Sequence, residues 1–80
     1  MNEKYTTSDM ALTAYLACRG FAIDGIKDDP DSPTRKLFII ARKRGLRIED
    51  AVGEFHERRG MVEPNAYFNE IKALKNRLYQ

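Results

Sequence analysis

The sequence has little of what small proteins use to strengthen a thin core. It is 80 residues long, which suits one domain over residues 1–80, and its only cysteine leaves no disulfide within the chain. Its only histidine, His56, has no second histidine or cysteine at ligand spacing, so no metal site is expected. Association between chains therefore remains as the source of further stability.

Long apolar runs and targeting signals are also missing. No stretch approaches the roughly 18–20 apolar residues of a membrane span, and residues 1–5 lack the charged and apolar regions of a signal peptide. Cys18 lies in an apolar stretch and predicts a small buried side chain rather than a reactive thiol. A single cysteine fits a reducing compartment, so we expect a cytoplasmic protein.

No catalytic constellation is recognisable. The sequence contains no G-x-S-x-G nucleophile motif and no glycine-rich phosphate loop. The acids Asp28, Asp29 and Asp31 lack the glycine and glutamate that a calcium-binding EF-hand loop needs. His56 is expected to be a partly exposed helical histidine. We therefore expect a protein that is not an enzyme and that holds no cofactor and no metal.

The first predicted helix covers Tyr5–Gly20. Thr6 and Asp9 have the spacing of a capping box, with Thr6 as the N-cap. The final glycine is expected to adopt a positive φ and end the helix. Phe21 would then fold back on Leu16, as in a Schellman motif.

Two strands are predicted next, Phe21–Ile26 and Leu37–Ala41, paired as an antiparallel hairpin. Gly25 predicts a bulge or a bend in the first of them. Residues 27–34 contain two prolines and three acids and are predicted to be a loop. The second strand lacks polar alternation, so we expect it to be covered on both faces.

Two amphipathic helices complete the predicted fold. Apolar residues at helical spacing predict a second helix that Gly60 ends: Ile48, Ala51, Val52 and Phe55. Pro64 suits the first turn of a third helix, whose apolar face comprises Tyr67, Phe68, Ile71, Leu74 and Leu78. The prediction is an α+β domain in the order α-β-β-α-α, with a two-stranded antiparallel hairpin packed with three helices.

Two segments resemble a known family. The first is Tyr5 to Leu16 followed by Gly20-Phe21, and the second is Val62-Glu63-Pro64 with Phe68 and then Leu74 to Tyr79. Both resemble the opening and closing segments of short phage and bacterial proteins that are catalogued as a domain of unknown function. The resemblance implies a phage or mobile-element setting and supports the predicted fold. It implies no catalytic residue and no ligand.

The most informative feature is a run of basic residues without an intervening acid. Its members are Arg35, Lys36, Arg42, Lys43, Arg44 and Arg47. Such a run can contact the phosphates of nucleic acid and release their counterions. The same pattern is also expected of a solvated hairpin end whose charges prevent strand-to-strand aggregation. Our first hypothesis is a non-catalytic accessory domain that contacts nucleic acid through this basic hairpin end.

The alternative hypothesis is a protein-interaction module that could self-associate, because a thin core and an apolar strand favour contact with a second chain. A ribbon-helix-helix reading is disfavoured, because Leu37–Ala41 offers no polar side chains to a DNA groove. Light scattering separates self-association from a monomer, and nucleic-acid titration tests the first hypothesis.

Overall fold

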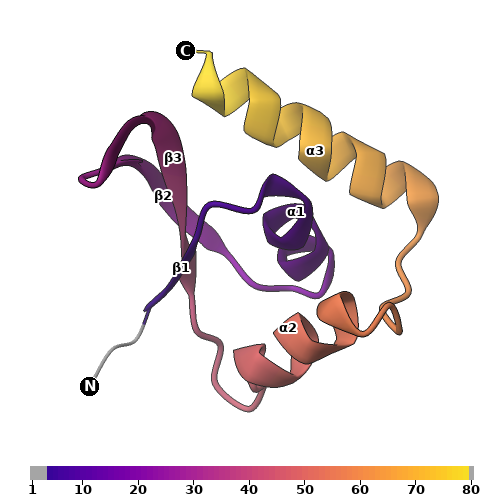
Figure 1. Cartoon of the computed structure of the whole chain (residues 1–80). Coiled ribbons are helices and arrows are strands. Elements are labelled where there is room, and N and C mark those ends of the chain that lie inside the picture. Colours follow the sequence, from indigo (N-terminus) through magenta and orange to yellow (C-terminus); the bar gives the residue numbers. More distant parts are fainter. Residues whose placement is uncertain (1–3, 80) are drawn as a thin grey trace.

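The computed structural model describes residues 4–79. Along the chain they form β1 (Lys4–Thr7), α1 (Met10–Cys18), β2 (Ile23–Asp29), β3 (Ser32–Ala41), α2 (Ile48–His56) and α3 (Pro64–Leu78). The sheet is antiparallel with the order β1-β3-β2, and the three helices lie on one side of it (Figure 1). The α+β class is therefore confirmed, whereas the two-stranded hairpin and the order α-β-β-α-α are wrong.

The strand that the prediction missed is β1, which had been assigned to the start of the first helix. Lys4–Thr7 pairs with the end of β3, with Tyr5 packed against the core and Thr6 exposed. The helix begins later, and its N-cap is Asp9, whose carboxylate accepts a hydrogen bond from the Leu12 N–H at 3.1 Å. Thr6 does not cap the helix, because the chain before Asp9 is extended.

The end of α1 is the predicted Schellman motif. Gly20 has a φ of 97°, a conformation that glycine adopts without steric cost. Its N–H donates to the Ala17 carbonyl at 3.0 Å, and the Phe21 N–H donates to the Leu16 carbonyl at 3.0 Å. The Phe21 side chain then enters the core, so this prediction is confirmed.

The predicted loop at residues 27–34 is instead the tip of a tight hairpin. Only Pro30–Asp31 form the turn, and the Asp31 N–H donates to the Asp29 side chain at 2.9 Å. Asp28 pairs with Lys36 and, after a register shift, Asp29 pairs with Ser32. The prediction failed because polar residues can form strands where opposite charges face each other across the ladder.

The central strand, β3, is covered on one face rather than two. Phe38 and Ile40 are buried beneath the helices, while the other face carries the half-buried side chains of Leu37, Ile39 and Ala41. We call these three residues the open sheet face. A central strand has neighbours along both edges, which partly shield its outer side chains and explain why it lacks polar alternation. The register shifts next to Gly25, as the predicted bulge requires.

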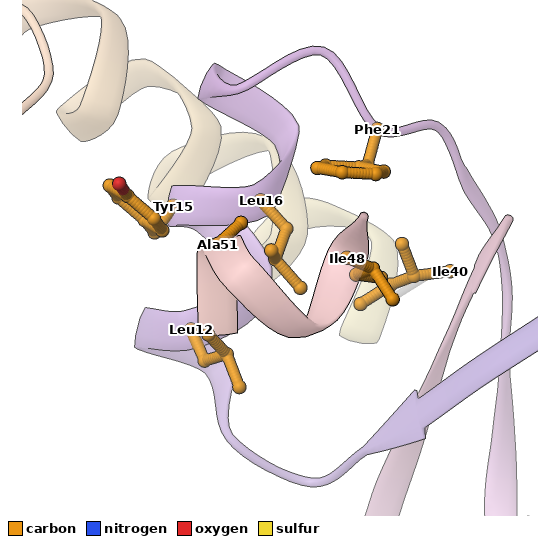
Figure 2. Close-up of a cluster of buried hydrophobic side chains, with 7 residues drawn as sticks. All are labelled: Leu12, Tyr15, Leu16, Phe21, Ile40, Ile48 and Ala51. Carbon is orange, nitrogen blue, oxygen red and sulfur yellow. The ribbon is translucent and has the colours of Figure 1, made fainter. Parts of the chain in front are cut away.

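The core has α1 at its centre. One buried cluster joins this helix to the sheet and to α2 through Leu12, Tyr15, Leu16, Phe21, Ile40, Ile48 and Ala51 (Figure 2). A second cluster joins its opposite side to α3 through Ala14, Phe38 and Leu74. Because α1 is buried on several sides, it is apolar around most of its circumference rather than along one stripe.

The end of α2 is a Schellman motif without glycine. The N–H groups of Arg58 and Arg59 donate to the carbonyls of Phe55 and Glu54 at 3.1 and 2.9 Å. Arg58 has a φ of 60°, a left-handed conformation that costs a non-glycine residue roughly 1 kcal/mol or more. The helix therefore ends at His56, before the predicted Gly60, and an arginine occupies the left-handed position that follows its C-cap.

The glycine that was predicted to end α2 has a different role. A Cβ added at Gly60 would lie 2.6 Å from Cε1 of Tyr15. The chain after α2 therefore passes directly over this aromatic ring, and only a residue without a side chain fits there.

The last helix packs as its apolar spacing predicts. Glu63 caps α3 by accepting hydrogen bonds from the N–H groups of Asn65 and Ala66, and Pro64 occupies the first turn. The inward residues are Tyr67, Ile71, Leu74 and Leu78. Phe68 lies at the edge of this face and is 60% exposed.

Candidate nucleic-acid interface

The six predicted contact residues fall into two groups at opposite ends of β3. Arg35 and Lys36 lie near the hairpin turn, whereas the other four lie in the connection from β3 to α2. At about 3.3 Å per residue, the strand separates the two groups by roughly 20 Å. The structure therefore brings together Arg42, Lys43, Arg44 and Arg47, and we call these four residues the basic turn.

The charges of Arg35 and Lys36, the hairpin group, are neutralised by acids of the neighbouring strand β2. Lys36 forms an ion pair with Asp28, and Arg35 lies 4.0 Å from the carboxylate of Asp29. The sequence showed a run of cations without acids, but the fold places Asp28 opposite Lys36 and brings Asp29 close to Arg35. Charge pairing across a hairpin cannot be seen from a linear count of charges.

The basic turn is partly paired. Nη1 of Arg42 lies 2.5 Å from Oε2 of Glu49, and Nε of Arg47 lies 3.8 Å from Oδ2 of Asp50. The hydrogen bond from Arg42 lowers the pKa of Glu49 below its usual range. Both ion pairs lie at the surface, where such pairs contribute about 0–1 kcal/mol.

Two cations of the basic turn have no acidic partner among residues 4–79. Lys43 and Arg44 lie in a turn closed by a hydrogen bond from the Leu46 N–H to the Lys43 carbonyl at 3.2 Å. Gly45 has a φ of 84°, which lets the chain reverse there. A Cβ added at Gly20 would lie 3.3 Å from Nζ of Lys43, so this ammonium lies beside the C-terminus of α1, where a cation is favourable.

A buried tyrosine links α1 to α2 by a polar cluster that the sequence did not predict. The Tyr15 hydroxyl donates to Oε1 of Glu54 at 2.8 Å and accepts from Nη1 of Arg19 at 2.9 Å. Arg19 also pairs with Glu54. Burial raises the pKa of Tyr15, and the hydrogen bond from its hydroxyl lowers the pKa of Glu54. With its hydroxyl bonded on both sides, the tyrosine stabilises the helix pair.

An open cavity of about 310 Å³ lies next to this cluster, where α1, α2 and α3 meet. Its lining residues are Tyr15, Phe55, Arg58, Gly60, Val62 and Tyr67. The rings of Tyr15 and Phe55 lie 5.7 Å apart between centroids. The Tyr67 hydroxyl donates to the Ala11 carbonyl at 3.1 Å and thereby holds α3 against α1.

The remaining reactive side chains do not assemble. His56 is exposed, and its ring packs edge-on against Phe55 at 5.5 Å between centroids. Cys18 is half-buried, and burial raises the pKa of its thiol, which disfavours the reactive thiolate. Over residues 4–79, no three acids, histidines or cysteines cluster as metal ligands. No helix in that range is long and apolar enough to cross a membrane.

Comparison with known proteins supports the resemblance seen in the sequence. No curated protein and no solved structure matches the chain. A family model described as "Domain of unknown function (DUF5659)" matches residues 2–80, which is nearly the whole chain. The chain therefore belongs to this family, DUF5659.

Proposed function

We propose that this domain contacts nucleic acid, without catalysing a reaction on it, through the basic turn. The observation that carries the proposal is the pair Lys43 and Arg44, which are exposed in the turn before α2 and have no acidic partner in residues 4–79. Cations of this kind neutralise phosphates and gain free energy from counterion release.

The other two cations of the turn can join such a contact. Arg42 pairs with Glu49 and Arg47 pairs with Asp50 at the surface. The two arginine side chains are 38% and 75% exposed. Exchanging a surface carboxylate for a phosphate costs little, because the ion pair itself is weak. Arginine also forms bidentate hydrogen bonds with phosphate oxygens. A phage or mobile-element setting, which the sequence resemblance implies, remains a prediction.

The test is a titration of labelled duplex and single-stranded DNA and RNA at several salt concentrations. We expect binding at about 50 mM salt that weakens as salt rises. The slope of log binding constant against log salt concentration reports the number of phosphates contacted. The double variant Lys43→Ala with Arg44→Ala should make this slope shallower by the equivalent of about two phosphate contacts.

The hairpin group provides the matched control. Arg35→Ala with Lys36→Ala removes the same charge from residues that already face Asp29 and Asp28, so the salt dependence should stay close to that of the unaltered protein. The absence of binding at about 50 mM salt would contradict the proposal. An equal loss in both double variants would show general charge attraction rather than a site at the turn.

A second candidate function is self-association through the open sheet face. Leu37, Ile39 and Ala41 alternate along β3 with the buried Phe38 and Ile40 and therefore lie on the other face of the sheet. The helices lie on one side of the sheet only (Figure 1). A two-fold dimer would cover this face with the same face of a second copy, since a two-fold interface is self-complementary.

A further inference from the structure

The cavity at the junction of the three helices is lined mainly by aromatic side chains. Three aromatic rings, those of Tyr15, Phe55 and Tyr67, form its walls. The two tyrosine hydroxyls already donate to groups of the protein, Glu54 and the Ala11 carbonyl. The walls therefore offer mainly ring surface to anything that enters the cavity.

The one fixed charge in the lining belongs to Arg58. No carboxylate among residues 4–79 pairs with its guanidinium, although the neighbouring Arg59 pairs with Glu57 at 2.8 Å. A guanidinium presents several N–H donors in a plane that matches a carboxylate. The cavity thus combines an apolar body with a single unpaired cation.

The backbone at Arg58 adds to this observation, because glycine is the usual residue at this position of a Schellman motif. Its φ of 60° is a conformation that glycine adopts more readily than arginine. Nothing in the packing of α2 requires an arginine at this position, because the motif uses only backbone hydrogen bonds. Residues held in unfavourable backbone conformations are frequent at binding sites.

We propose that this cavity binds a small apolar carboxylate, with its body between the three rings and its carboxylate on the Arg58 guanidinium. The volume of about 310 Å³ is at the lower end of ligand pockets, which suits one ring on a short chain. The same chemistry is presented by a free aromatic acid and by the C-terminus of a peptide that ends in an apolar residue. This proposal does not depend on nucleic-acid contact.

The first experiment titrates the full chain with phenylacetate and follows the backbone amides of Gly60, Val62 and Tyr67 by NMR. We expect these amides to shift and to saturate with a Kd on the order of 1 mM, as befits so small a ligand. Phenylacetamide, which keeps the ring and lacks the charge, should bind at least about tenfold more weakly, because it loses the charged contact.

The decisive variant is Arg58→Gly. Glycine suits the φ of 60°, so the variant should melt no lower than the unaltered protein while its affinity for phenylacetate falls at least about tenfold. The matched control is Arg59→Ala, which removes the same charge one residue away from the cavity lining and should change the affinity less than about twofold. Together these variants separate loss of the site from loss of folding.

Two tripeptides, Ala-Ala-Phe with a free and with an amidated C-terminus, distinguish the source of the carboxylate. Tighter binding of the free-acid peptide than of phenylacetate supports a chain terminus as the ligand, and the reverse supports a free acid. The proposal is overturned if neither acid shifts the cavity amides at about 20 mM, well above the expected Kd. It is also overturned if the uncharged probe or Arg58→Gly binds equally well, or if the Met61 side chain, 89% exposed beside the cavity, is found to fill it.

Discussion

A single carboxylate sets the start of α1. The Asp9 side chain accepts from the Leu12 N–H, while its backbone carbonyl accepts from the Thr13 hydroxyl at 2.8 Å. Asp9→Ala should therefore lower the free energy of unfolding by about 1 kcal/mol in urea denaturation. Thr6→Ala should lower it by less than about 0.5 kcal/mol, since Thr6 is exposed on the sheet. A larger loss for Thr6→Ala would place the cap where the sequence pattern had predicted it.

The roles of two glycines show which structural requirements can be predicted from the local sequence. Gly20 was predicted correctly, because a helix end followed by an apolar residue has a recognisable local pattern. Gly60 was not, because its requirement comes from Tyr15, which is distant in sequence. A glycine needed for a positive φ and a glycine needed for close packing look identical in a sequence.

At the scale of the element, α3 depends on one buried leucine. Leu74 is 1% exposed and packs with Ala14 and Phe38. Leu74→Ala should cost about 2–5 kcal/mol, which is a large part of the stability of so small a domain. Lys72→Ala should cost less than about 0.5 kcal/mol, because Lys72 is exposed and its ammonium lies over the ring of Phe68 at the surface. Similar urea midpoints for the two variants would contradict the packing of α3.

Long periodic elements were predictable and short or polar ones were not. The spacing in α2 and α3 identified both helices, and the apolar run at the end of β3 identified its core-facing part. β1 has four residues, too few for an alternating pattern to stand out. The hairpin tip was missed because its residues are stabilised by partners across the ladder rather than by their own propensity.

At the scale of the whole molecule, the pairing of charges could not be predicted. The six cations of the candidate site were identified from the sequence, yet only the fold shows that they separate into two groups and that four of them face acids. The cavity lined by Arg58 could not be predicted from the sequence either, because its walls come from α1, α2, α3 and the segment between α2 and α3. Sites formed by several elements leave no local pattern.

Self-association is a property at this same scale. If the open sheet face is an interface, the mass measured by light scattering should rise toward that of two chains as the concentration approaches about 1 mM. Leu37→Lys should weaken association at least about tenfold by placing an ammonium in the interface. Phe68→Lys makes the same kind of change at an exposed position of α3, outside the open sheet face, and should have little effect. A single-chain mass at every concentration rules this function out.

The pairing of β1 with β3 also determines when the sheet can be completed. The β2–β3 hairpin forms from neighbouring residues, whereas β1 must meet residues 38–41, across the whole of α1 and β2. Closing so long a segment costs more conformational entropy than closing the hairpin. During synthesis the first strand leaves the ribosome well before its partner exists. The sheet should therefore grow from the hairpin, and β1 should add last, in the slow step that distant contacts impose on folding.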